Sequence, residues 1–172
     1  MWSGFTQSPG FIKAVIATYP GISPIIERDK PPLGAPIIPP EVLEGHLKSM
    51  EKGKIVTAAD PPARIDVWLS IAQQSRLMEF WGTDERFDNW KLLEKTSEVP
   101  YTLILHGSED TAVPVAKSIK WVDKIKQKFG EAKIDLYIEP GVEHGFDVEL
   151  PLNTPWLEER LKKVTALWLE KE

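Results

Sequence analysis

The chain has 172 residues, enough for one domain with a buried core, and its 42% hydrophobic and 27% charged residues are the composition of a globular protein. Its net charge of -5 disfavours nucleic acid and anionic membranes as partners, the absence of cysteine excludes disulfides and thiolate chemistry, and no apolar run is long enough for a membrane span. The N-terminal stretch MWSGFTQSPG lacks the basic and apolar regions of a signal peptide, so we expect a cytoplasmic protein.

The first predicted element is a strand over residues 11–19 (FIKAVIATY), which stops at Pro20-Gly21. The run is almost continuously apolar and contains β-branched residues, as is typical of a strand buried on both faces of a sheet. Prolines crowd the next stretch, residues 20–40, so its backbone must be irregular or extended.

A helical region follows. Residues 41–52 carry apolar side chains at helical spacing. Asp60 and Pro61 form the start signal of a second helix, because Asp caps free N–H groups and Pro suits the first helical position. The apolar stripe of this helix comprises Ile65, Trp68, Leu69 and Ala72 and continues towards Leu77 and Trp81. Residues 86–95 predict a third, shorter helix, so that residues 21–98 form a helical insertion punctuated by proline.

The rest of the chain alternates strand and helix. Residues 101–105 (YTLIL) predict a buried strand, residues 115–129 a helix, and residues 133–139 (KIDLYIE) a half-exposed strand near a sheet edge. A last helix begins at Thr154-Pro155. The apolar side chains of this helix that we expect to face the core are Leu157, Leu161, Val164 and Trp168. This order predicts one three-layer α/β domain with about three parallel strands and flanking helices. Its core comprises residues 1–20 and 99–172, and a cap-like insertion comprises residues 21–98.

Two loops carry the side chains best suited to chemistry, LHGSEDTAVP (105–114) and EPGVEHGFD (139–147). Each follows the C-terminal end of a predicted strand, which is the edge where open parallel sheets bind ligands. We therefore expect Asp110 and His144 to meet at one rim. A buried carboxylate there would fix the imidazole tautomer and stabilise the imidazolium that forms when the histidine takes a proton from a nucleophile.

These motifs, HG-x-x-D-x-x-V-P and, one helix and one strand later, G-x-x-H-G-F, resemble the closing section of α/β-hydrolases, closest to the esterase and lipase-like group. The resemblance covers roughly residues 11–20 and 100–170. It implies a partial α/β-hydrolase fold in which Asp110 is the triad acid and His144 the triad base. It also implies that the insertion occupies the place of the family's cap and that the substrate is an ester or another apolar small molecule.

The family's nucleophile elbow, G-x-S-x-G, is absent from this sequence. By the resemblance the elbow would fall several residues before Met1. Ser3 and Ser8 lie too close to the first strand, and Ser108 shares a turn with the acid and is poorly aimed. Whether the chain alone is an enzyme stays open. The alternatives are an esterase-like site whose serine comes from a partner or an upstream segment, a hydrolase scaffold that binds a small molecule or catalyses a rearrangement or cyclisation, and a pseudoenzyme that pairs with another chain.

Other polar residues have simpler interpretations. Glu109 is an alternative acid, but a solvated surface charge explains it as well, and His106 fits a packing role before a strand-end glycine. We expect His46 to be exposed on a helix. Three scattered histidines without ligand spacing predict no metal site, and no motif indicates a cofactor. Several aromatic residues of the insertion could either line an apolar pocket or form the core of the cap: Trp68, Phe80, Trp81, Phe87 and Trp90.

The strand over residues 11–19 also bears on association. It has the pattern of an interior strand, but without an upstream neighbour it becomes an edge with unpaired N–H and C=O groups. We therefore expect the chain to form a homodimer, or to pair with a complementing chain, through this strand.

Overall fold

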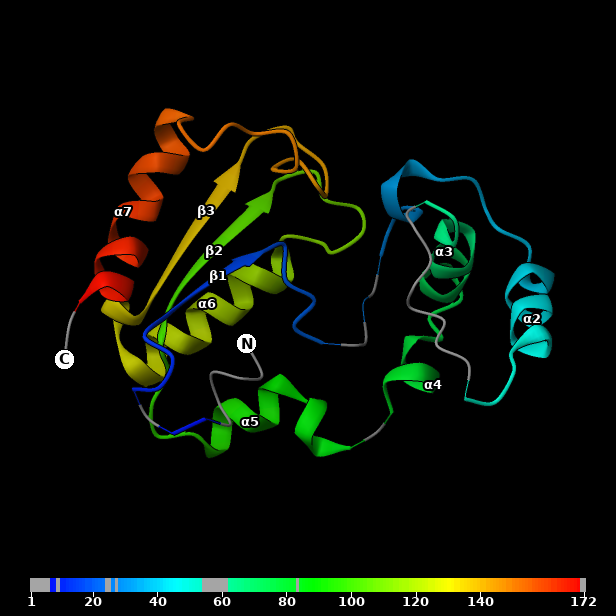
Figure 1. Cartoon of the computed structure of the whole chain (residues 1–172), viewed down its shortest axis with the longest axis horizontal. Coiled ribbons are helices and arrows are strands. Elements are labelled where there is room, and N and C mark those ends of the chain that lie inside the picture. Colours follow the sequence, from blue (N-terminus) through cyan, green and yellow to red (C-terminus); the bar gives the residue numbers. More distant parts are fainter. Residues whose placement is uncertain are drawn as a thin grey trace.

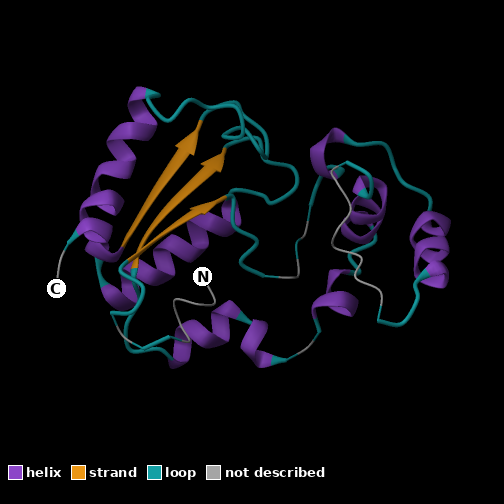
Figure 2. Ribbon diagram, in the orientation of Figure 1, coloured by secondary structure: helices purple, strands orange, loops and turns teal. Residues whose placement is uncertain are grey.

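The computed structural model describes residues 7–8, 10–23, 26, 28–53, 62–82 and 84–170. They form a sheet lobe and a helical lobe that lie next to each other (Figures 1 and 2). The sheet lobe contains β1 (Ala14–Thr18), β2 (Tyr101–Gly107), β3 (Ile134–Glu139), α5 (Asn89–Lys95), α6 (Ala116–Phe129) and α7 (Pro155–Leu169). The helical lobe contains the 3-10 helix η1 (Pro32–Gly34), α2 (Pro40–Ser49), α3 (Ile65–Gln73) and α4 (Leu77–Trp81). None of the helices in this described part has the length and apolar character that a membrane crossing requires.

The sheet is parallel with the strand order β1-β2-β3, and Ala14 lies opposite Tyr101 while Thr102 lies opposite Ile134. This confirms the predicted parallel sheet of about three strands. β3 lies at an edge and, apart from the buried Ile134, is half-buried, as its alternating pattern indicates. β1 differs from the prediction, because only Ala14 is buried. Within the described residues β1 pairs with β2 alone, and Ile16 and Ala17 pack against the clusters on opposite faces of the sheet but stay only partly buried.

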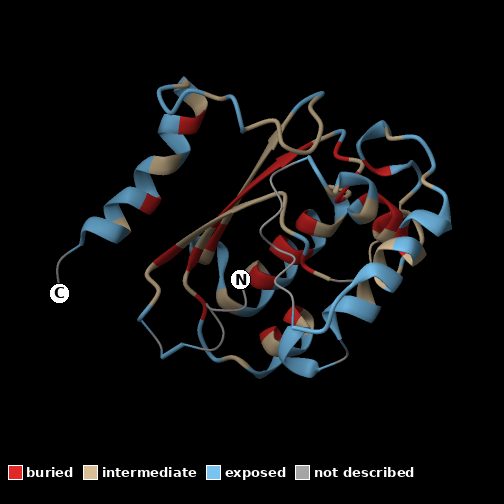
Figure 3. Cartoon of the chain, turned by 45° about the vertical axis from the view of Figure 1, so that its right-hand side comes forward, coloured by how far each residue is buried: buried red, intermediate tan, exposed pale blue. Residues whose placement is uncertain are grey.

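The central strand β2 is the core of the sheet lobe, and Figure 3 shows buried residues along it and on the helix sides next to it. Successive side chains of a strand point to opposite faces. Accordingly, Leu103 and Leu105 pack with Leu157 and Val164 of α7, whereas Ile104 packs towards α6. The two helices therefore lie on opposite faces of the sheet, which gives the three layers that the sequence predicts.

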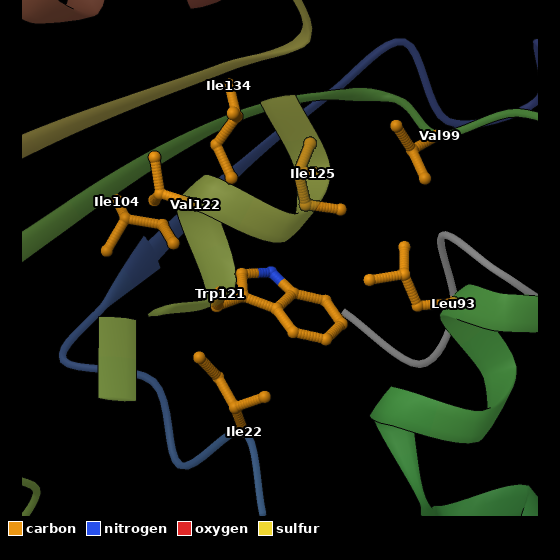
Figure 4. Packing of buried hydrophobic residues seen from close by; sticks show 8 residues of the cluster. All are labelled: Ile22, Leu93, Val99, Ile104, Trp121, Val122, Ile125 and Ile134. Carbon is orange, nitrogen blue, oxygen red and sulfur yellow. The ribbon is translucent and has the colours of Figure 1, made fainter. Parts of the chain in front are cut away.

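Trp121 is the largest fully buried side chain and centres the α6 face (Figure 4). It contacts the ring of Trp90 edge-on at 4.9 Å between centroids and belongs to a cluster with Ile22 and Leu93. Helix α5, which carries Trp90 and Leu93, thus packs against α6, although its sequence lies inside the predicted insertion. Ile119, which the periodicity would also place in the core, is exposed.

Trp168 of α7 differs from the prediction. As part of the apolar stripe it is predicted to face the core, but 52% of its surface is exposed. The last turn of α7 reaches the start of β1, where the indole Nε1 donates to the carbonyl of Ala14 at 3.1 Å. The ring therefore keeps a polar contact and an exposed face, a common arrangement for tryptophan.

Two predicted helices are interrupted. The helix expected to run on towards Trp81 ends at Gln73, because Ser75 adopts a left-handed backbone conformation (φ 56°), and α4 starts at Leu77. The start signal at Asp60-Pro61 lies outside the described residues. The helix expected over 86–95 is split into a 3-10 turn at Glu85–Phe87 and α5, because the Asp88 carboxylate accepts from the backbone N–H groups of Trp90 and Lys91 and caps a new helix.

Candidate active site

The loops that follow β2 and β3 meet at the carboxyl edge of the sheet. The N–H of Glu109 donates to the carbonyl of Val142 at 3.0 Å, and that of Ser108 to Glu139 at 2.9 Å. Gly107 makes this approach possible, since a Cβ at this position would overlap the Val142 carbonyl oxygen. The backbone thus fixes the two loops side by side before any functional side chain is considered.

Asp110 and His144 are in direct contact at this rim. Oδ2 of Asp110 lies 2.8 Å from Nδ1 of His144, so Nδ1 carries the proton of this hydrogen bond. Asp110 is 5% exposed, and its Oδ1 accepts from the N–H of Val113 at 2.7 Å. His144 is half-buried and keeps Nε2 for a further partner. The two residues predicted from the motifs therefore have the geometry of an acid that orients a base.

The surroundings of Asp110 keep its carboxylate ionised. Burial raises the pKa of this group, but hydrogen bonds with His106, His144 and the N–H of Val113 outweigh burial and hold the pKa well below its usual range. A carboxylate that stays charged at neutral pH is the partner that an imidazolium requires.

His106 takes part in the same network. It is completely buried, Nε2 lies 2.7 Å from the carbonyl of Val113, and Nδ1 lies 2.8 Å from the hydroxyl of Ser118. The carbonyl can only accept, so Nε2 carries the proton, which also lies near Oδ2 of Asp110 at an N···O distance of 3.3 Å. The side chain of His106 thus makes polar contacts at the site in addition to filling space in the core. Although His106 and His144 are far apart in the sequence, both flank one carboxylate.

Glu143 connects the two loops by hydrogen bonds. The sequence reasoning did not identify it as a residue of the site. Its Oε2 accepts from the N–H groups of Thr111 at 3.0 Å and His144 at 2.6 Å, and its Oε1 accepts from the Thr111 hydroxyl. Burial raises the pKa of Glu143, but these hydrogen bonds outweigh it, and the pKa is lowered. Thr111 also accepts from the N–H of Leu33 in η1 at 2.8 Å. An acid directly before the motif histidine was the available signal.

Tyr19 is a second residue that the sequence reasoning missed. It follows β1, and its ring lies 4.0 Å from the imidazole of His144 between centroids, tilted by 51°. Its φ of 34° is unusual for a bulky residue. The N–H of Tyr19 donates to the carbonyl of Leu105 at 2.7 Å, which extends the pairing of β1 with β2 and fixes this conformation. Burial, and the nearby Asp147, raise the pKa of the Tyr19 hydroxyl.

A cavity of about 930 Å³ lies between this rim and the helical lobe. His144, Tyr19 and Val113 line it from the sheet lobe, and Trp68 and Trp81 from the helical lobe. Of the five aromatic residues of the insertion, these two tryptophans thus line a pocket. Trp90 belongs to the core around Trp121, and Phe80 and Phe87 are exposed.

Arg28 lines the same cavity and joins the two lobes. Its Nε donates to the carbonyl of Ala112 at 2.7 Å, next to the site, and its Nη1 donates to the carbonyl of Ala72 in α3 at 3.2 Å. Burial lowers the pKa of its guanidinium, although the charge of Asp110 partly opposes this. No motif in the sequence indicated this residue.

The remaining candidates lie as follows. The hydroxyl of Ser108 accepts from the N–H of Gly141 at 2.8 Å, and Glu109 is exposed, as a surface charge would be. Ser8 is exposed, and Ser3 lies outside the described residues. His46 lies on α2 as predicted but is half-buried rather than exposed. Across the described ranges, no group of three or more His, Asp or Glu side chains has the spacing for a metal ion.

Comparison with known proteins adds three findings. The model of the prolyl oligopeptidase family matches residues 55–160. The chain is similar to the probable carboxylesterase M8 of Phoma sp. (strain ATCC 20986 / MF5453), at 26% identity over 91% of this chain and 52% of that protein, so it spans about half the length of this curated relative. It also aligns with esterase 2 of Thermogutta terrifontis phosphonylated by sarin, at a TM-score of 0.42 and 21% identity over 56% of this chain and 33% of that chain.

Proposed function

Since the chain belongs to the prolyl oligopeptidase family, within the α/β-hydrolase superfamily, we propose that it supplies the acid and the base of a serine-dependent site that cleaves carboxylic esters. The contact between Asp110 and His144 beside a cavity carries this proposal. The similarity to a protein named as a probable carboxylesterase supports esters as the substrate class. The largely apolar helical wall, with Trp68 and Trp81, supports an apolar group on the ester.

The proposed reaction assigns one role to each side chain. Nε2 of His144 takes the proton of a serine hydroxyl while the serine oxygen attacks the ester carbonyl, and Asp110 stabilises the imidazolium. The C–O bond to the alcohol then breaks, and His144 returns the proton to the leaving oxygen. Water attacks the acyl-enzyme in the same way, which releases the acid and restores the serine. These steps need no metal or cofactor, because the imidazole carries each proton.

The serine has to come from outside the described site. No G-x-S-x-G motif occurs in the sequence, and Ser108 is held by Gly141. The edge of β1 that has no partner strand among the described residues supports a place for the serine, because Tyr19 at the end of β1 already lies against His144. We place the serine-bearing segment beside this edge, on a complementing chain or on an upstream segment.

The test uses the chain produced in its native host with an affinity tag after Glu172, so that any accompanying segment or partner is retained. We expect hydrolysis of p-nitrophenyl butyrate and labelling of a serine by a fluorophosphonate. His144→Ala should lower kcat/KM by at least roughly a hundredfold. The control His46→Ala changes a histidine on α2 that does not line the cavity, and it should leave kcat/KM unchanged. Full activity of His144→Ala, or no hydrolysis by the wild-type sample, would contradict the proposal.

A second candidate function rests on the cavity. Its volume of about 930 Å³ suits a small-molecule ligand without any covalent step. In that case His144 would act as a general acid or base in a rearrangement or cyclisation, or only as a ligand contact. The same samples separate the two candidates. Ligand-dependent thermal stabilisation without ester hydrolysis or serine labelling supports the second, and labelling supports the first.

A further inference from the structure

Arg28 is a half-buried cation on the wall of the cavity. Within the described ranges, no carboxylate forms an ion pair with its guanidinium. The neighbouring Asp29 and Lys30 also line this cavity, but both are exposed, and no ion pair joins the Asp29 carboxylate to Arg28. Buried charges in proteins are normally paired, because desolvation of an unpaired charge is costly. The described part of the chain therefore supplies no contacting counter-charge for this cation on the cavity wall.

The hydrogen bonds of Arg28 fix its position without neutralising it. Nε donates to the carbonyl of Ala112, and Nη1 donates to the carbonyls of Ile26 at 3.3 Å and Ala72. All three acceptors are neutral. Within the described residues, the donors on Nη2 bind no protein group. A guanidinium held in this way keeps the N–H groups of Nη2 for a ligand, and its charge gives such a donor a short, strong hydrogen bond with a carboxylate oxygen.

Asp110 does not take the place of this missing partner. Its charge is felt by Arg28, but its oxygens already receive the N–H of Val113 and the two histidines. Asp110 therefore serves the base, and Arg28 faces the cavity with its charge only partly offset. The apolar side chains of Trp68 and Trp81 on the same cavity offer no counter-charge either.

We infer that Arg28 binds a carboxylate of the substrate, so that the preferred esters carry an acid group beside an apolar one. This inference rests on the proposed ester hydrolysis for its reaction, but not for the binding itself. Arg28 contacts Ala112, two residues after the Asp110 that contacts His144. The bound carboxylate therefore lies close to the reacting carbonyl, which favours a short spacer between the acid group and the ester.

Binding is tested without any turnover. Isothermal titration calorimetry compares hexanoate with hexanamide, which has nearly the same shape and no charge, on the full chain. We expect the wild type to bind hexanoate roughly tenfold more tightly. Arg28→Gln should remove this difference and leave hexanamide binding unchanged, and Lys48→Gln, which removes an exposed cation on α2, should keep it. Equal binding of the two ligands by the wild type would overturn the inference and needs no variant.

Turnover is tested on a matched pair of esters, mono-p-nitrophenyl glutarate and p-nitrophenyl pentanoate. Arg28→Gln should raise KM for the glutarate ester about tenfold and leave KM for the pentanoate ester near its wild-type value. If neither ester is cleaved but hexanoate still binds through Arg28, the proposed function fails and the carboxylate site stands. Circular dichroism checks that Arg28→Gln is folded. If it is not, Arg28→Lys, which keeps the charge but loses the planar guanidinium that three hydrogen bonds hold in place, is used instead, and unchanged discrimination in that variant contradicts the role of the guanidinium.

Discussion

The Asp110 carboxylate accepts hydrogen bonds from several donors, beyond the single backbone N–H that an aspartate in a turn commonly binds. Val113 binds one oxygen, His144 the other, and the proton of His106 lies 3.3 Å from that second oxygen. Each of these donors is itself buried or held by a loop, so the carboxylate has little freedom to rotate. At the scale of single residues, this fixed carboxylate gives His144 its orientation before any substrate arrives.

Glu143 should make the stability of the rim depend on pH. Its pKa is lowered in the folded protein, whereas a glutamate in the unfolded chain titrates near about 4.3. The stabilisation is therefore complete above this value and is lost as the pH falls towards the lower folded pKa. In urea unfolding, Glu143→Gln should be less stable than the wild type at pH 7, and the difference in unfolding free energy should narrow at about pH 3. An equal gap at both pH values would assign Glu143 no ionic role.

The sequence predicts the two reactive residues better than their supports. Asp110 and His144 belong to short motifs at strand ends, and parallel strands bring such ends to one edge. Tyr19 and Glu143 carry no motif of their own, and their roles arise only when loops distant in the sequence come together. Arg28 lies in an irregular proline-rich stretch whose path no periodicity predicts.

At the scale of elements, Gly107 sets the distance between the loops after β2 and β3. Gly107→Ala should lower the free energy of unfolding by about 1–3 kcal/mol, because the new Cβ overlaps the carbonyl of Val142. It should also weaken ester hydrolysis, since the loop that carries Asp110 has to move away from His144. Gly45→Ala is the matched control. Gly45 lies in α2 with no atom near the added Cβ, so this change should raise helix stability by roughly 0.5–1 kcal/mol. Thermal unfolding of both variants measures the difference, and equal effects would contradict it.

The type and order of most elements are readable in the sequence, but their interruptions are not. The apolar run of β2 and the long periodic patterns of α6 and α7 identify them directly. The break after Gln73 depends on the left-handed Ser75, and the new start of α5 depends on the Asp88 carboxylate. Both interruptions depend on local backbone conformation, which the spacing of apolar residues does not predict.

At the scale of the whole molecule, β1 lies at the end of the described sheet. Within the described residues its second side has no strand partner. We expect the chain to associate through this edge, as a homodimer or with a complementing chain, because unpaired backbone groups favour pairing. Light scattering after size exclusion should give at least twice the mass of one chain, and the mass should persist at high salt because backbone pairing does not depend on charge. A sharp peak of single chains would contradict the expectation.

Hydrogen bonds run without a gap from the helical lobe to the histidine. The N–H of Leu33 binds Thr111, Thr111 binds Glu143, and Glu143 binds the N–H of His144. The position of η1 and the backbone of the loop that carries His144 are therefore tied together, so a change that displaces Leu33 should be felt at the histidine, two side chains away.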